Sequence, residues 1–182
     1  MSEKQSFSDS VCSKCSQKCC SFHKKNNPEA TLSYNEVKRI EQATGHSDFY
    51  EEKQSCFADT SYYKLKVTSN NDCVFYDTQK EICTIYDIRP MDCKLYPFDF
   101  DAFEPGKGYM WMLNDCLFSQ QFDEETIDEM INDFESNYME EISEIYFCGD
   151  TSFEGTEDRE GFRILREMKI PNPLRTKPKS RN

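Results

Sequence analysis

The sequence lacks the features that most quickly assign a protein to a class. It has no long apolar run, so we expect no transmembrane helix, and its first residues, MSEKQSFSDS, carry no hydrophobic stretch of the secretory kind. It contains only six glycines and two histidines. There is no glycine-rich phosphate loop, no His-Glu-x-x-His motif and no Gly-x-Ser-x-Gly elbow. The sequence alone therefore identifies no catalytic residue and leaves open whether the protein is an enzyme.

Core-forming residues and positive charge are also scarce. Apolar residues make up 37% of the 182 and charged residues 31%, which is little core material for a chain of about one domain's length. The 34 acidic side chains outnumber the 22 basic ones and give a net charge of −12. This balance argues against a nucleic-acid binder and against attraction to an anionic membrane surface.

Cysteine, by contrast, is abundant. Ten cysteines occur in a chain with no export signal, so we expect a cytoplasmic protein whose thiols stay reduced. In that compartment such a set more often holds metal than forms disulfides. A disulfide framework is the structural alternative, because ten is an even number.

The cysteines fall into two groups. The first is the dense cluster Cys12-x-x-Cys15-x-x-x-Cys19-Cys20, and the Cys-x-x-Cys spacing lets two thiolates of one turn reach the same tetrahedral ion. The second group is spaced ten and ten, with one cysteine further on. Eight thiolates suffice for two four-thiolate sites, or a subset forms one site. The candidate ligands are Cys12, Cys15, Cys19, Cys20, Cys73, Cys83, Cys93 and Cys116, and the candidate cofactors are a [4Fe–4S] iron–sulfur cluster or zinc.

The surroundings of the first group favour ionised thiols. From Cys12 to Lys25 the sequence has four lysines and no acidic residue, and nearby ammonium groups favour thiolate over thiol. His23 offers a site of three cysteines and one histidine as an alternative, whereas His46 is expected on the surface. Cys56 and Cys148 lie outside both groups and are expected to be ordinary thiols.

The clearest local signal is the start of a helix. Ser33 and Glu36 form a candidate capping box. Leu32 and Val37 stand where a hydrophobic staple would place them, and Gly45 is a suitable C-terminal stop. Residues 46–61 are expected to be irregular, and the alternation over residues 62–68 predicts a strand.

A hairpin is predicted over residues 73–83, with residues 77–79 as its loop. In that register Cys73 faces Cys83, and their β-carbons lie roughly 5 Å apart, which would also permit a disulfide. A short helix is expected over residues 89–97, begun by Pro90 and ended by Pro97. A second hairpin is predicted from residues 98–103 and 109–113.

The C-terminal third separates its charges. Residues 123–147 predict one long helix with an apolar stripe and an acidic outer face. Across residues 122–161 fifteen acidic residues stand against Arg159 alone, and residues 163–182 carry seven basic residues against Glu167. We expect this tail to be disordered or folded back onto the helix, and either the acidic helix or the basic tail to contact another protein.

Together these elements predict an α+β fold. We expect a small metal-organised domain with short antiparallel hairpins, several short helices and one long acidic C-terminal helix. The expected boundaries are a mobile lead-in over residues 1–10, a cysteine-cluster domain over 11–148 and a basic tail over 149–182. Because the chain is poor in core residues, we expect the metal to supply most of its folding stability.

The order of the cysteines resembles that of a known family. The cluster at residues 12–20, the helix after it, the stretch CTIYDIRPMDCKLYPF at 83–98 and the late Cys116 together resemble the YkgJ-like cysteine-cluster family. That family is described as a zinc- or iron-chelating domain and as an iron–sulfur protein. The resemblance covers residues 12–116 and implies metal ligation by Cys12, Cys15, Cys19, Cys20, Cys73, Cys83 and Cys93, with Cys116 a further candidate.

The resemblance implies a leading function and two alternatives. The leading function is iron–sulfur binding through thiolates, and one alternative is a zinc-stabilised, non-enzymatic protein-binding module. The family also includes flagellin lysine N-methylases, but this chain is short for that branch and has no identifiable nucleotide site. Within the motif we expect Arg89 to offset thiolate charge and aromatic side chains such as Tyr86 to exclude water.

Overall fold

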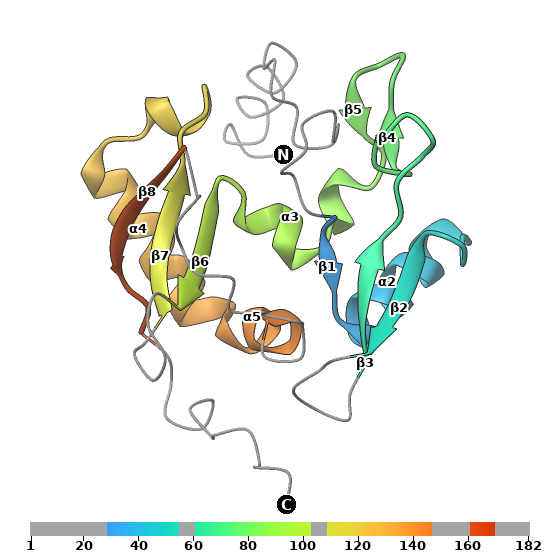
Figure 1. Ribbon diagram of the computed structural model, residues 1–182, viewed down its shortest axis with the longest axis horizontal. Helices are drawn as coiled ribbons and strands as arrows, with labels where there is room; N and C mark the ends of the chain where they lie inside the picture. Colours follow the sequence, from blue (N-terminus) through green and yellow to red (C-terminus); the bar gives the residue numbers. More distant parts are fainter. Residues whose placement is uncertain (1–28, 55–60, 103–108, 147–160, 170–182) are drawn as a thin grey trace, which may run out of the picture.

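The computed structural model describes residues 29–54, 61–102, 109–146 and 161–169, and there the chain is α+β, as predicted (Figure 1). Two lobes lie side by side, joined by the turn η1 (Tyr86–Ile88) and the helix α3 (Met91–Leu95). The first lobe holds β1 (Thr31–Leu32), α2 (Tyr34–Thr44), β2 (Tyr50–Gln54), β3 (Ser61–Leu65), β4 (Tyr76–Asp77) and β5 (Ile82–Cys83). The second holds β6 (Phe98–Ala102), β7 (Tyr109–Asn114), η2 (Ser119–Gln121), α4 (Glu124–Asn137), α5 (Met139–Tyr146) and β8 (Phe162–Glu167).

Helix α2 begins and ends where the sequence predicts. The Ser33 hydroxyl accepts the Glu36 N–H at 3.3 Å, and the Glu36 carboxylate accepts the Ser33 N–H at 2.9 Å, which confirms the capping box. Gly45 closes the helix with a φ of 72°, a left-handed conformation that glycine adopts without steric cost. Val37 and Ile40 are buried, so α2 presents its apolar stripe to the first lobe.

Strand β3 is the centre of an antiparallel sheet with the order β1-β3-β2. The strand predicted over residues 62–68 is present as β3, which ends at Leu65, but the expectation that residues 46–61 are irregular is wrong for residues 50–54. All five residues of β2 pair along β3, from Tyr50 opposite Leu65 to Gln54 opposite Ser61. Strand β2 has the sequence YEEKQ and is mostly exposed. Charged side chains are typical of an edge strand. Because of them, β2 lacks the alternation of apolar and polar residues by which a half-buried strand is recognised in a sequence.

The hairpin over residues 73–83 forms in a different register from the predicted one. Tyr76 lies opposite Cys83, and Asp77 lies opposite Ile82. Cys73 and Cys83 are therefore not cross-strand partners. No disulfide joins any two of the cysteines within the described ranges.

The turn of this hairpin explains the shift. Asp77 Oδ1 accepts the N–H groups of Gln79 and Lys80, each at 3.0 Å, which is the side-chain turn that aspartate favours. Glu81 then takes a left-handed φ of 57° before β5 begins. Asp77 thus stays in the strand, and residues 78–81 form a loop one residue longer than expected.

The second lobe contains a sheet with the order β6-β7-β8. The hairpin predicted from residues 98–103 and 109–113 is confirmed as β6 and β7, and the helix predicted over residues 89–97 is α3. The expectation of an irregular basic tail is wrong for residues 162–167. They form β8, in which Phe162 pairs with Asn114 and Ile164 with Met112 of β7.

The acidic helix predicted over residues 123–147 is divided into α4 and α5. Asp123 caps α4 by accepting the Thr126 N–H at 2.8 Å. The backbone leaves the helical region at Tyr138, with φ −131° and ψ 8°, and Figure 1 shows α5 turned away from the axis of α4. This turn buries Met139 and Ile142 in the core. In the described ranges, none of the helices combines the length and apolar character needed to cross a membrane.

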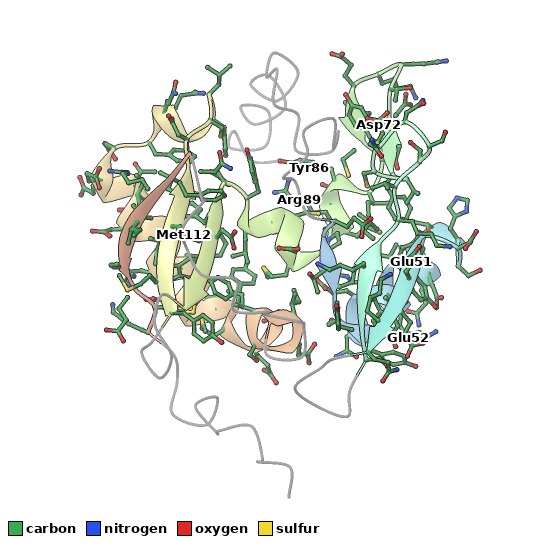
Figure 2. The ribbon with its side chains drawn as sticks, viewed as in Figure 1. Glu51, Glu52, Asp72, Tyr86, Arg89 and Met112 are labelled. Carbon is green, nitrogen blue, oxygen red and sulfur yellow. The ribbon has the colours of Figure 1, made fainter. Side chains whose placement is uncertain are left out.

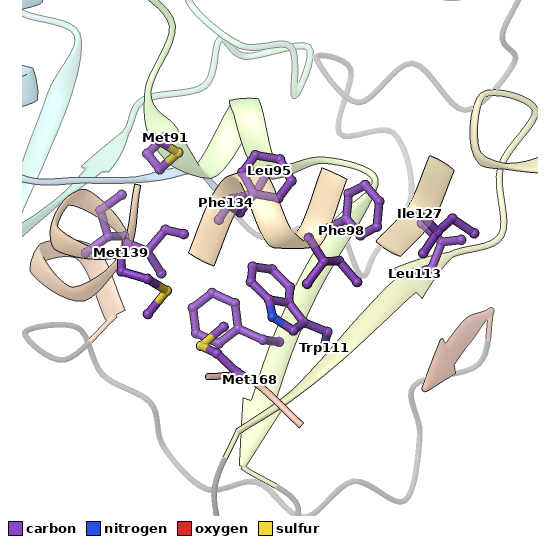
Figure 3. Packing of buried hydrophobic residues seen from close by; sticks show 13 residues of the cluster. Met91, Leu95, Phe98, Trp111, Leu113, Ile127, Phe134, Met139 and Met168 are labelled. Carbon is purple, nitrogen blue, oxygen red and sulfur yellow. The ribbon is translucent and has the colours of Figure 1, made fainter. Parts of the chain in front are cut away.

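Each lobe has its own apolar core. The second-lobe core is the larger, with thirteen buried members, and fully buried Trp111 packs its ring 5.5 Å from Phe100 and 6.0 Å from Phe134 (Figure 3). The first-lobe core has nine buried members: Ala30, Leu32, Val37, Ile40, Phe49, Leu65, Cys73, Phe75 and Ile85. The first lobe therefore has the smaller apolar core, and the scarcity of apolar residues affects this lobe more than the second.

Candidate metal centre

Helix α3 joins the lobes and carries one of the predicted ligands. Met91 and Leu95 are buried in the second-lobe core, whereas Cys93 packs against the first-lobe core. Helical geometry explains the division, because positions 91 and 95 share a face and position 93 points the other way. Figure 1 shows α3 between β1 and β6. Cys93 therefore lies at the junction of the two lobes.

Two further predicted ligands reach the same core from other segments. Cys73 follows β3, forms an isolated bridge with Val67 and is only 6% exposed. Cys83 ends β5, is half-buried and packs against the core that contains Cys73. The structure thus brings Cys73, Cys83 and Cys93 to one apolar cluster.

The sulfur of Cys73 also has a hydrogen-bonded environment. The Phe75 N–H donates to Cys73 Sγ at 3.5 Å. Hydrogen bonds to sulfur stabilise thiolates and are a usual feature of cysteine-ligated metal centres. The donor chemistry of this region therefore fits a metal that prefers thiolate.

Cys116 occupies a different place. It lies just beyond β7 in the second lobe, is 3% exposed and is a member of neither core cluster. Its sulfur accepts the Ser119 N–H at 3.4 Å, and the Ser119 hydroxyl accepts the Cys116 N–H at 2.9 Å. The structure does not bring Cys116 to the core on which Cys73, Cys83 and Cys93 pack.

The rest of the predicted set falls outside the described residues. Within the ranges that are described, no three His, Cys, Asp or Glu side chains lie close enough to hold a metal ion. His46 is exposed, as expected. The residues beyond these ranges are Cys12, Cys15, Cys19 and Cys20 of the first group, together with His23, Cys56 and Cys148.

Two carboxylates tie the cysteine-bearing helix to the first lobe. Glu36 Oε1 accepts the Met91 N–H at 2.6 Å, at the start of α3. Asp92 Oδ2 accepts the Thr31 N–H at 2.7 Å, at the start of β1. Burial raises the pKa of Glu36 above its ordinary value of 4.5, while hydrogen bonds from backbone N–H groups oppose that shift.

Positive charge gathers around the same helix. Arg89 stacks on the Tyr86 ring, with its guanidinium carbon 4.1 Å from the ring centroid (Figure 2). Arg39 donates to the Ile88 and Arg89 carbonyls at 3.5 and 3.4 Å. Burial, followed by the charges of Arg39 and Arg89, lowers the pKa of Lys94. Beside Cys83, an open hollow of about 340 Å³ is lined by the end of α2 and residues 83–88.

The two carboxylates are the site residues that the sequence analysis does not identify. Glu36 is fully explained by its capping box, so nothing in the sequence indicates a second contact. Asp92 is a common residue in a first helical turn. Their partners lie 55 and 61 positions away, and no local pattern reports contacts over such separations.

Comparison with known proteins places these residues in a family. A model of the CxxCxxCC family, described as "putative zinc- or iron-chelating domain", matches residues 11–126. The match spans all eight candidate ligands, although this chain has three residues between Cys15 and Cys19 where the family's name has two. Searches of curated proteins and of solved structures found no match. Since the family model matches more than half of its length, the chain belongs to the CxxCxxCC family.

Proposed function

We propose that this chain binds an iron–sulfur cluster through cysteine thiolates. Cys73, Cys83 and Cys93 are the ligands from the folded first lobe, and the N-terminal cysteine group supplies the rest. One observation carries the proposal: three thiols from three separate segments pack on a single apolar cluster, within the span matched by a chelating family. A bound cluster supplies one-electron redox chemistry at a potential tuned by its surroundings.

The first-lobe core provides a water-poor wall for these thiolates. Phe75 and Ile85 are each 6% exposed, and Phe49 packs on Phe75 with ring centroids 5.2 Å apart. Burial and hydrogen bonds to sulfur tune both the affinity and the reduction potential of thiolate centres. The wall and the Phe75 N–H therefore have a role beside an iron–sulfur cluster as well as in packing.

The local charge supports the same proposal. A cluster held by thiolates is anionic, and cations nearby stabilise both the thiolates and the complex. Arg39 donates to backbone carbonyls just before α3, Arg89 lies over the Tyr86 ring, and Lys94 follows Cys93 directly. These three cations face the Glu36 and Asp92 carboxylates at the same helix, so in a chain whose net charge is −12 the charge around Cys93 is balanced rather than acidic.

The spacing of the three thiols in the described residues suits a cluster, whereas the Cys12-x-x-Cys15 pair fits either metal. Structural zinc sites typically take cysteines in pairs, separated by two to four residues in one turn. Cys73, Cys83 and Cys93 come singly from three segments. Each iron of a cluster takes its own protein thiolate, so ligands on separate segments suit it. Zinc is the competing metal.

The test is the metal content of the full-length protein. After anaerobic purification, we expect iron and acid-labile sulfide in equal amounts, with visible absorption that reduction bleaches. Stoichiometric zinc in a colourless protein would keep chelation and overturn the cluster. A protein that binds neither metal, even after reconstitution with ferrous iron and sulfide, would overturn both.

Single substitutions identify the ligands. We expect Cys93→Ser and Cys73→Ser to lose most of the bound metal, because serine is a poor substitute for thiolate. The matched control is Cys56→Ser, which lies between the two ligand groups and is expected to keep the metal. Equal loss in Cys56→Ser and Cys93→Ser would contradict the assignment.

A further inference from the structure

Helix α3 is too short to hold its own position. It has five residues, well below the length at which an isolated helix is stable. Its N-cap residue, Pro90, provides no side-chain hydrogen bond, so the first N–H groups need acceptors from elsewhere. The position of Cys93 therefore depends on contacts made by other parts of the chain.

Glu36, in helix α2 of the first lobe, supplies the acceptor for the first N–H group of α3. One carboxylate oxygen, Oε2, accepts the Ser33 N–H and completes the local capping box. The other oxygen, Oε1, accepts the Met91 N–H at 2.6 Å, across 55 positions of sequence. The local role uses only the first oxygen, so the second contact has a separate purpose.

Burying a carboxylate to make this contact costs free energy. The Glu36 side chain is 8% exposed, and Arg39 Nη2 is 3.8 Å away. Burial raises the pKa of Glu36, which means that the folded protein disfavours its charged form. Hydrogen bonds from the backbone N–H groups of Ser33 and Met91 offset part of this cost, so the contact with α3 is one of the two that hold this side chain in place.

Asp92 makes a second connection between α3 and the first lobe. Its Oδ2 accepts the Thr31 N–H at 2.7 Å, and Thr31 is in β1, the first described strand after the N-terminal cysteine group. The two contacts fix α3 against α2 and β1, while Met91 and Leu95 hold its other face in the second lobe. Cys93 lies between these restraints.

We propose that Glu36, supported by Asp92, is a positioning residue that holds Cys93 where the metal centre needs it. This inference rests on the proposed function, because a metal must bind for the position of Cys93 to matter. Glu36 does not touch the metal or its ligands and acts only through the Met91 N–H. Metal affinity should therefore fall when Glu36 is truncated, even though every cysteine is retained.

The experiment compares two truncations of the same capping box. Glu36→Ala removes the box and the contact with α3, whereas Ser33→Ala removes the Ser33 hydroxyl and leaves the Glu36–Met91 bond. Loss of a partner that hydrogen-bonds a metal ligand typically lowers metal affinity about 10- to 100-fold. Glu36 acts through the backbone of α3, one step further from the metal, so we expect a loss at the lower end, about tenfold, in Glu36→Ala and an affinity near wild type in Ser33→Ala, measured by competition with a chelator for reconstituted iron.

Amide hydrogen exchange of residues 91–95 provides a second measurement. In the wild type we expect the Met91 N–H to exchange slowly, and in Glu36→Ala to exchange at least tenfold faster, about 1.4 kcal/mol at room temperature. If Glu36→Ala does not fold, Asp92→Ala tests the other contact, and Asp92→Asn should rescue it because the amide oxygen still accepts the Thr31 N–H.

The outcomes separate this inference from the proposed function. A wild type that binds no metal but protects the Met91 N–H overturns the function and, with it, the need to position Cys93. A wild type that binds metal, with equal affinities in Glu36→Ala and Ser33→Ala, overturns only the positioning role. An unprotected Met91 N–H in the wild type also overturns it.

Discussion

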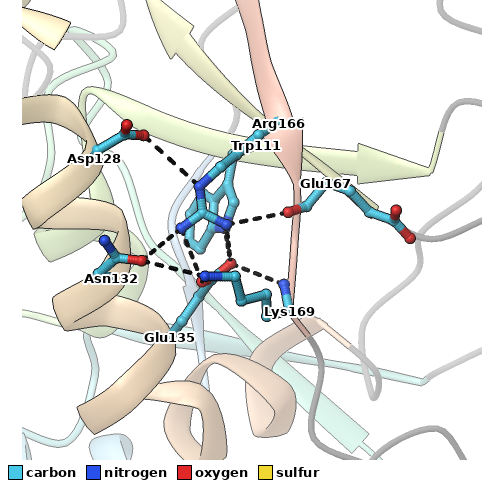
Figure 4. A network of polar contacts seen from close by, with 7 residues as sticks. All are labelled: Trp111, Asp128, Asn132, Glu135, Arg166, Glu167 and Lys169. Atoms are coloured by element: carbon cyan, nitrogen blue, oxygen red, sulfur yellow. Dashed lines mark hydrogen bonds and ion pairs between the residues drawn. The ribbon is translucent and has the colours of Figure 1, made fainter. Parts of the chain in front are cut away.

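The two lobes each bury one glutamate, and they do so in opposite ways. In the second lobe Glu135 is 5% exposed and binds the Arg166 guanidinium with both oxygens at 2.9 Å (Figure 4). The Trp111 Nε1–H and the Lys169 N–H add bonds of 3.0 and 2.8 Å. In the first lobe the Glu36 side chain is 8% exposed, and its partners are two backbone N–H groups and Arg39 Nη2 at 3.8 Å.

The pKa values of the two glutamates express this difference. Burial raises the pKa of Glu135, but hydrogen bonds from Arg166, Lys169 and Trp111 outweigh it, so the pKa lies below the ordinary 4.5. Burial dominates at Glu36, and its pKa lies above that value. The second lobe thus stabilises itself with a compensated ion pair and a large aromatic core. The first lobe has a smaller core and an undercompensated charge that serves α3.

The largest expected effect concerns how strongly each lobe depends on bound metal for its folding. Removing it anaerobically with a chelator should unfold the first lobe and leave the second folded, because only the first packs Cys73, Cys83 and Cys93 on its core. Bound structural metal contributes on the order of 10 kcal/mol of apparent free energy. Amide hydrogen exchange should show fast exchange in β3 and slow exchange in β7. Simultaneous loss of protection in both strands would contradict the independence of the lobes.

The second prediction breaks the ion pair of the second lobe. Arg166→Met should lower the free energy of unfolding by about 2 kcal/mol, because it removes both charge-assisted hydrogen bonds from the buried Glu135 carboxylate and leaves only the exposed Lys169 ammonium, 3.8 Å away, as its cation. Urea denaturation followed by Trp111 fluorescence measures this loss directly. The matched control is Arg163→Met in the same strand: Arg163 pairs with Glu124, but both side chains are more than half exposed, so we expect almost no change.

The contrast between the lobes also explains what the sequence predicts about the fold. The helix α2 is predicted correctly because Ser33, Glu36 and Gly45 act within a few residues of one another. The β6–β7 hairpin and α3 follow from equally local turn and proline signals. Strand β8 is missed because its anchor, the Arg166–Glu135 pair, spans 31 positions. The break at Tyr138 is missed because the apolar stripe continues across it.

The same distinction between local and long-range contacts applies to the candidate site. The sequence predicts Cys73, Cys83 and Cys93, with Cys116 further on, as one group. The structure brings the first three to one core but not Cys116, and ligation of metal by these cysteines stays a prediction. The register of the hairpin is predicted wrongly because the side chain of Asp77, not the backbone alone, determines the loop. Glu36 is predicted as a helix cap and nothing more, because its contact with α3 joins distant parts of the chain.

A smaller effect is expected at two matched glycines. Gly45 ends α2 in the first lobe with a φ of 72°, and Gly161 precedes β8 in the second with a φ of 93°. An added Cβ meets nothing within 4 Å at either position, so only backbone strain opposes alanine. Each substitution to alanine should cost about 1 kcal/mol, and hydrogen exchange should report the loss in its own lobe. Asparagine, which tolerates this conformation, should cost less.

The last prediction is that the stabilising contributions of the two glutamates depend on pH in opposite directions. The pKa of Glu135 is lowered on folding, so its stabilisation is present above pH 4.5 and is lost as pH falls through the folded value. The pKa of Glu36 is raised, so its contribution is full below pH 4.5 and is lost as pH rises through the folded value. Glutamine does not titrate. The destabilisation caused by Glu135→Gln should therefore shrink as pH falls below 4.5, whereas that of Glu36→Gln should grow as pH falls from neutral toward 4.5, measured by urea denaturation at each pH. Parallel slopes in the two variants would show that both carboxylates are compensated in the same way.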